Sequence, residues 1–175
     1  MRILAAYCVS PSTLARRAEA RAQQDPAVLA GVDVWDDFAR EDGPLYSLAK
    51  ARNRCRLRAI TGGYDLMLAL DADAIVESLP AEWTDFGIAL VRDYAGNPDY
   101  QPAAWWGIGR DVFTRHAWCE GYRGHGWEER DFAEVVCHRV SKAILSDFRC
   151  RHLPHPPATP NDGNAGLFRH RLSHL

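Results

Sequence analysis

The sequence predicts an α/β domain in which a mainly parallel sheet is flanked by helices. One observation behind this prediction is the alternation of short apolar runs with stretches of helical periodicity along most of the chain. A second is the apolar run 66–70, which follows a glycine pair and ends abruptly in Asp71 and Asp73. The third is a length of 175 residues with 47% hydrophobic content, which suits one domain with a substantial core.

The elements expected before the acidic strand alternate between strand and helix. They are a strand at 2–9, a helix capped at Ser12 or Thr13 that runs to about residue 24, a strand at 31–35, and a helix capped at Ser47 that ends at Gly62. Because strand and helix alternate, most neighbouring strands are expected to run parallel.

The second half of the chain is expected to add further strands and one long helix. The strands are expected at 87–91, at 105–113 (leading into a helical turn) and at 148–153. The helix is expected from Trp127, because apolar residues recur there at helical spacing, namely Phe132, Val135, Val136, Val140, Ala143 and Ile144. The domain is then expected to span 1–156, with a loop-like or partly disordered tail at 157–175.

Composition excludes several classes of protein. The formal net charge of -2 gives no bulk attraction to nucleic acid or anionic lipid. The five cysteines form no CxxC pair and are odd in number, so a disulfide framework or a zinc site is not expected. No signal peptide and no apolar run of membrane-spanning length are recognisable, which predicts a cytoplasmic protein without membrane insertion.

Asp71 and Asp73 form the first group that could carry chemistry. A buried strand cannot hold two carboxylates without partners, so they are expected at its carboxyl end, where open α/β sheets bind ligands. Two carboxylates there suit Mg²⁺ or Mn²⁺. The alternative interpretation is a surface loop in which the acids cap the next turn.

Two later groups could act with these acids. Glu128, Glu129 and Asp131 open the predicted helix, where a carboxylate could be a general base or merely favour the helix dipole. His152 or His155 could complete a metal site with an imidazole, or could be structural. Alternation along a strand predicts that the two histidines do not face the same ion.

The order of these groups is similar to that of a known family. The segments concerned are KARN at 50–53, LALDAD at 68–73, WWGIGRDVF at 105–113, GWEERDF at 126–132 and RHLPH at 151–155. In this succession the chain resembles the inverting glycosyltransferases of GT-A fold over about residues 1–156. The resemblance implies a nucleotide-sugar donor, by default a uridine diphosphate (UDP) sugar, and inversion at the anomeric carbon.

The resemblance also implies roles for individual residues. Donor binding would fall to Ala5, Tyr7, Asp36 (or Asp37), Arg52 near the diphosphate, Asn53, Asp71, Trp106 and Gly107. The metal would be held by Asp73, by Asp71 or its bound water, and by His152, with His155 as the fallback. Within EERD, Glu129 would be the base and Glu128 would lie near sugar hydroxyls, with Asp131 as a further candidate. Trp127 and Gly126 would contact the acceptor.

Other functions remain open at the level of the sequence. A haloacid-dehalogenase-like phosphatase also ends a strand in DxD but usually has Thr or Val where this chain has Ala74. A sugar nucleotidyltransferase would need a glycine-rich loop after its first strand, and a non-catalytic nucleotide-sugar binding module would share the fold. The acceptor could be a surface-glycan precursor, a protein, a small metabolite or a hydroxymethylated base of phage DNA. The last would be helped by an arginine-lined face from Arg110, Arg115, Arg123, Arg130, Arg169 and Arg171.

Overall fold

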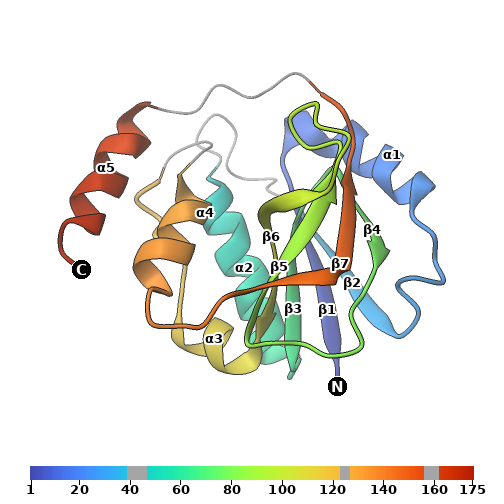
Figure 1. Ribbon diagram of the computed structural model, residues 1–175, viewed down its shortest axis with the longest axis horizontal. Helices are drawn as coiled ribbons and strands as arrows, with labels where there is room; N and C mark the ends of the chain where they lie inside the picture. Colours follow the sequence, from blue (N-terminus) through green and yellow to red (C-terminus); the bar gives the residue numbers. More distant parts are fainter. Residues whose placement is uncertain (39–46, 123–126, 156–161) are drawn as a thin grey trace.

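A mixed β-sheet forms the centre of the computed structural model, which describes residues 1–38, 47–122, 127–155 and 162–175 (Figure 1). Within these ranges the sheet has seven strands in the order β2-β1-β3-β6-β5-β7-β4. The strands are β1 Ile3–Val9, β2 Val32–Phe38, β3 Leu66–Asp71, β4 Ala74–Ser78, β5 Phe86–Arg92, β6 Gln101–Gly109 and β7 Ala143–His152. The helices are α1 Leu14–Gln23, α2 Leu48–Thr61, α3 Arg110–Arg115, α4 Glu128–Asp131 and α5 Asp162–Leu172.

The half of the sheet that carries the acidic strand is parallel, as expected. β1 pairs in parallel with both β2 and β3, and Cys8 is the register partner of both Asp37 and Asp71. In the other half, β6 is antiparallel to β3 and β5, β7 is parallel to β5, and β4 is antiparallel to β7. Because β1, β2 and β3 run parallel, their carboxyl ends lie together, and Asp71 is at the carboxyl end of β3.

Side-chain alternation along the strands builds an apolar core on each face of the sheet. Leu4, Ala6 and Cys8 of β1 pack with α2 and α3 on one face, while Ala5 and Tyr7 point into the core of the other face. Figure 1 shows α2, α3, α4 and α5 on one side of the sheet and α1 on the other. The predicted α/β fold is therefore confirmed, and helix α2 begins after Ser47, whose hydroxyl accepts from the Lys50 amide as expected of a cap.

Strand β2 is longer than the sequence predicts. It does not stop at Trp35 but continues through Asp36 and Asp37 to Phe38, paired with β1 up to Val9. The two acids point to opposite faces and each meets an arginine from the helix on that face, which compensates their charge. These two acids, which follow the predicted strand, are thus part of the sheet.

The predicted long helix after Trp127 is wrong in its second half. Helix α4 passes into a short π-helical segment, Phe132–Val136, and the chain then turns. Ala143 and Ile144 belong to β7, where Ala143 pairs in parallel with Gly87 of β5. The helical spacing of these two apolar residues does not produce a helix, because pairing with β5 satisfies their backbone groups equally well.

The C-terminal tail is also different from the prediction, since Asp162–Leu172 forms helix α5. Its own composition favours a helix only weakly, but it buries Asn164 and Phe168 and contacts α4. Tertiary contacts therefore stabilise it where local propensity does not. Within the described residues, no helix is both long enough and apolar enough to cross a membrane.

Candidate active site

Asp73, His152 and His155 lie together where β3 ends and β7 ends. The antiparallel pairing of β4 with β7 sets Ala74 opposite His152, and the Leu153 amide donates to the Asp73 carbonyl (3.1 Å). His155 Nε2 is 3.0 Å from Asp73 Oδ2, and His152 Nε2 is 3.8 Å from Asp73 Oδ1. The prediction that the two histidines face apart is wrong, because β7 ends at His152 and strand alternation does not extend to His155.

The donor atoms of this cluster fit a divalent metal ion. One carboxylate oxygen and two imidazole nitrogens lie within 4.8 Å of one another. Ligand atoms ~2.1 Å from a shared ion lie ~3–4 Å apart, which matches the distances of 3.0 and 3.8 Å between the two imidazoles and the Asp73 carboxylate. Asp73 Oδ1 and His152 Nδ1 are buried and have no hydrogen-bond partner among the residues that the structure describes. Two imidazoles with one carboxylate suit Mn²⁺ better than Mg²⁺, which prefers oxygen ligands alone.

Burial shapes the protonation of these ligands. The pKa of His152 is lowered, mainly by burial, although the Asp73 carboxylate opposes the shift. Its imidazole is therefore held in the neutral form that binds metals. Burial and the nearby Asp71 carboxylate raise the pKa of Asp73. Arg16 of α1 places Nη1 3.4 Å from Asp73 Oδ2 and brings a positive charge to the same point.

Asp71 has a different environment from Asp73. Its Oδ1 accepts a hydrogen bond from Arg52 Nη2 (3.0 Å), and its Oδ2 accepts one from Trp105 Nε1 (2.9 Å). The Trp105 ring also stacks on His152, with centroids 5.7 Å apart. Asp71 is thus fixed by two donors, whereas Asp73 retains an oxygen without such a donor among the described residues.

The three acids of the EERD segment occupy distinct positions. Glu129 is bonded to Arg52 Nη2, the same nitrogen that donates to Asp71, and its side chain is 22% exposed. Glu128 is buried. Asp131 is fully buried, and its Oδ1 accepts from Tyr122 Oη (3.0 Å) and Arg171 Nε (2.6 Å). Glu129 is therefore the acid of the segment that is both linked to Asp71 and accessible to solvent.

Tyr94 is a residue of this region that the sequence analysis missed. Its ring meets His152 edge-on, with centroids 5.2 Å apart. Asp93 and Ala95 on either side have left-handed backbones, with φ of 63° and 52°, a conformation that costs energy in non-glycine residues. Burial, together with the carboxylates of Glu129 and Asp71, raises the pKa of Tyr94 to about 12, so its phenol stays a neutral hydrogen-bond donor. Arg16 and Trp105 were missed as well, because no motif singles out one arginine or tryptophan among many.

Three residues predicted to bind the donor have packing roles in the structure. Trp106 lies in the core between Phe86 and Phe132. Gly107 is in the middle of β6, where an added Cβ would collide with the Trp83 ring. The Asn53 amide is bonded to both the amide and the carbonyl of Trp118, and so fixes the segment after α3.

The remaining predicted residues that the structure describes lie in β1, in β2 and at the start of α4. Ala5 and Tyr7 are buried in β1, with the Arg17 guanidinium 3.4 Å above the centre of the Tyr7 ring. Arg17 Nε also donates to Asp36 Oδ1 (2.7 Å). Trp127 has a left-handed backbone (φ 73°) and stacks on Phe168 of α5, with centroids 5.3 Å apart. Gly126, predicted to contact the acceptor, lies outside the described residues.

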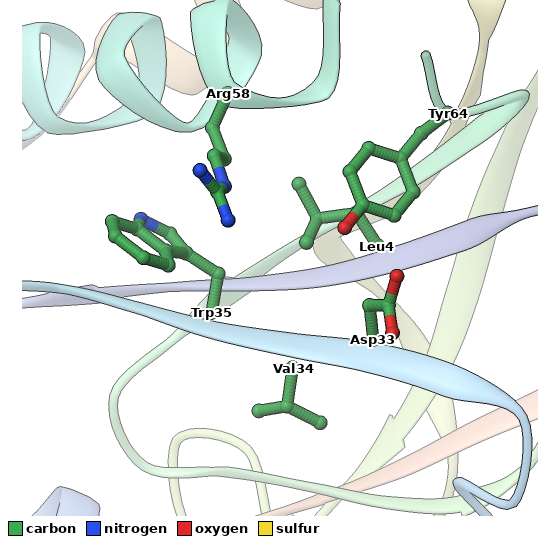
Figure 2. Close-up of a pocket in the computed structure, with 6 residues that line it drawn as sticks. All are labelled: Leu4, Asp33, Val34, Trp35, Arg58 and Tyr64. Atoms are coloured by element: carbon green, nitrogen blue, oxygen red, sulfur yellow. The ribbon is translucent and has the colours of Figure 1, made fainter. Parts of the chain in front are cut away.

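A separate groove of about 310 Å³ lies between β2 and α2 (Figure 2). Arg58 of α2 covers the Trp35 ring at 4.6 Å, and Asp33 and Tyr64 close the other end. Leu4 and Asp33 are register partners near the amino ends of their strands. The groove is thus at the opposite end of these strands from Asp71, and none of the predicted site residues lines it.

Comparison with known proteins supports the fold. No protein-family model and no curated protein matches the chain. Among solved structures, a Drosophila β-1,4-galactosyltransferase 7 mutant in complex with manganese, UDP-Gal and xylobiose matches with a TM-score of 0.69 and 14% identity, covering 98% of this chain and 81% of that one. The chain described here therefore has the fold of a glycosyltransferase.

Two further solved structures match the chain, and one of them is a glycosyltransferase. A glycosyltransferase involved in the glycosylation of the major capsid of PBCV-1 matches over 100% of both chains, with a TM-score of 0.57 and 11% identity. A197 from STIV matches with a TM-score of 0.54 and 14% identity, covering 89% of this chain and 87% of that one. In this glycosyltransferase fold, the cluster around Asp73 can hold a cation, and Glu129 can accept a proton from a hydroxyl close to it.

Proposed function

We propose that the protein is a metal-dependent glycosyltransferase that moves a sugar from a nucleotide-sugar donor, by default a UDP-sugar, to an acceptor hydroxyl with inversion. The observation that carries this proposal is the Asp73, His152 and His155 cluster at one edge of the sheet, joined to Glu129 through Asp71 and Arg52. The manganese and UDP-Gal in the Drosophila structure support the same chemistry for this fold.

The metal would be held by Asp73, His152 and His155. When bound, Mn²⁺ would neutralise the negative charge that develops on the departing diphosphate. Asp71, whose carboxylate is oriented by Arg52 and Trp105, would contact the ion through a bound water. Mn²⁺ is preferred to Mg²⁺ in this proposal because of the two imidazoles.

The chain's own groups would bind and orient the donor. Arg16 would exchange its contact with Asp73 for the negatively charged diphosphate, since its side chain is one-third exposed (32%) and lies beside the cluster. Asp36 at the end of β2 would approach the nucleoside, on the face where Arg17 covers Tyr7. The neutral phenol of Tyr94 would donate a hydrogen bond to the donor or the acceptor.

Glu129 would be the general base. As the acceptor oxygen attacks the anomeric carbon, its proton moves to the Glu129 carboxylate, and the bond between that carbon and the diphosphate oxygen breaks with its electron pair leaving on the diphosphate. A single displacement of this kind requires the base and the leaving group on opposite sides of the carbon and therefore inverts its configuration. Glu128 and Asp131 are buried, so neither is placed for this role.

A sugar hydroxyl is the proposed acceptor. The xylobiose in the Drosophila structure supports a glycan, and Trp127 with its partner Phe168 offers an aromatic surface beside α4. A hydroxymethylated DNA base has less support, because several arginines expected to form a DNA-binding face are engaged within the protein. Those engaged are Arg110 with Asp65, Arg115 with Asp111, and Arg171 with Asp131; Arg123 lies outside the described residues.

A donor screen tests the proposal. UDP-sugars and other sugar nucleotides are incubated with Mn²⁺, Mg²⁺ or a chelator, with and without xylosides, galactosides and other glycan acceptors, and nucleoside diphosphate release is measured. We expect Mn²⁺-dependent release that an acceptor increases, and a glycosylated product by mass spectrometry. Hydrolysis of sugar phosphates would instead indicate a phosphatase, pyrophosphate release a nucleotidyltransferase, and binding without turnover a non-catalytic module.

A further inference from the structure

Arg52 links two acids of the candidate site, Asp71 and Glu129, through a single nitrogen. Its Nη2 donates both to Asp71 Oδ1, at the end of β3, and to Glu129 Oε1, in α4. Arg52 itself lies on α2, so the consecutive elements α2 and β3 meet the distant α4 at this atom. A displacement of the guanidinium would therefore move both carboxylates.

Arg52 is a buried cation that these two carboxylates pair. Its side chain is 1% exposed, and a buried guanidinium is costly unless it is paired. Although burial alone would lower its pKa, the carboxylates of Glu129 and Asp71 raise it, so Arg52 remains charged. Its Nε and Nη1 find no acceptor among the described residues, although the Trp106 ring lies 5.9 Å from the guanidinium carbon. An apolar side chain would pack in this place at lower cost, so stability alone does not explain an arginine here.

We propose that Arg52 is a positioning residue that fixes the Glu129 carboxylate relative to Asp71, rather than a ligand of the donor diphosphate. This inference rests on the proposed function, in which Glu129 is the base and Asp71 belongs to the donor side. The reaction needs the base and the leaving group on opposite sides of one carbon atom, and small displacements are costly in such an arrangement. A charged group bonded to both carboxylates sets their separation before either substrate binds.

Two substitutions separate this role from direct donor binding. Arg52→Met keeps the length and the apolar contacts of the stem but removes the charge and both hydrogen bonds. Arg52→Lys keeps the charge, and an ammonium near the position of Nη2 can donate to both carboxylates, because one nitrogen already does so in the native protein. Arg56→Met is the matched control, because Arg56 is on the same helix and binds the carbonyls of Phe113 and Thr114.

The kinetic constants are measured with Mn²⁺, the UDP-sugar and the acceptor that the donor screen identifies, and melting temperatures are recorded alongside. We expect Arg52→Met to lower kcat about 100-fold or more, in the range typical of a lost general base, while donor KM changes less than about threefold. Arg52→Lys should recover activity to within about tenfold of the native protein. Arg56→Met should lower the melting temperature and leave kcat unchanged.

A change in donor KM without a change in kcat would overturn the inference. If Arg52→Met raises donor KM and leaves kcat intact, Arg52 binds the donor directly. If Arg52→Lys is as inactive as Arg52→Met, the shared charge is not what matters. Should Arg52→Met not fold, Arg52→Gln replaces it and is judged by the same kcat and KM. A native protein that releases no nucleotide from any donor would refute the proposed function itself, which distinguishes that failure from a wrong role for Arg52.

Discussion

The indole nitrogen of Trp105 donates a hydrogen bond of 2.9 Å to Asp71 Oδ2 while the same ring stacks on His152. One buried side chain therefore supports two groups from different strands, the acid at the end of β3 and the imidazole at the end of β7. Such partners behind a binding site fix the orientation of the groups that contact the ligand.

Replacing this tryptophan by Trp105→Phe should keep the stacking and remove the hydrogen bond. We expect kcat/KM for nucleotide release to fall about 10- to 100-fold, as for other partners of metal-site residues, and the free energy of unfolding to fall by about 1–3 kcal/mol. Steady-state kinetics and denaturant titration measure the two effects.

Trp118→Phe is the control for that substitution. Trp118 is equally buried, but its indole nitrogen has no hydrogen-bond partner among the described residues. The same change there removes no hydrogen bond and should leave kcat/KM close to the native value. Equal losses at both positions would contradict the assigned role of Trp105.

The metal cluster can be tested without any substrate. A ligand that binds only the folded protein stabilises it by about 2.7 kcal/mol at 100 times its dissociation constant. We expect Mn²⁺ to raise the melting temperature, a chelator to reverse the rise, and Asp73→Asn or His152→Ala to abolish it. His116→Ala, outside the cluster, should respond to Mn²⁺ like the native protein, and a full response in Asp73→Asn would exclude this site.

Arg16 provides a test of donor binding. Because a hydrogen bond to a charged group contributes about 1.5–3 kcal/mol, Arg16→Ala should raise the KM for the nucleotide-sugar about tenfold or more. The change in kcat should be smaller. Arg115→Ala is the comparison, since its exposed ion pair with Asp111 within α3 contributes about 0–1 kcal/mol and should not affect the donor. An unchanged donor KM in Arg16→Ala would mean that the diphosphate binds elsewhere.

Substitutions of Glu129 and Asp131 in the EERD segment should have different effects on kcat and on stability. Glu129→Gln should lower kcat about 100- to 10,000-fold, as expected for a general base, and should lower the melting temperature less than Asp131→Asn does, because Asp71 still pairs with Arg52. Asp131→Asn should instead lower the free energy of unfolding by about 1–3 kcal/mol, because its buried oxygen accepts from Tyr122 and Arg171. Kinetics and thermal melting of both variants decide the assignment, and the reverse pattern would make Asp131 the functional acid.

The elements with strong local signals were predictable. The strand 66–70 ending in Asp71, the cap at Ser47 and the parallel pairing around β1 follow from apolar periodicity and capping chemistry. The elements that failed had weak local signals: Ala143 and Ile144 fit a helical stripe and a strand equally well, and α5 is stabilised by contacts with α4 that composition does not reveal.

The pattern of residues along the chain predicts the alternation of strand and helix, the position of two acids at a strand end, and an order of groups that resembles a glycosyltransferase. Which of those groups meet depends on how the strands pair and the helices pack. Asp73 and His155 are 82 positions apart and come together because β4 pairs with β7, and Arg52 reaches Glu129 across 77 positions because α2 and α4 cover the same face of the sheet. Local patterns fix the backbone near each residue, whereas pairing between distant strands fixes which side chains can share one ion or one proton.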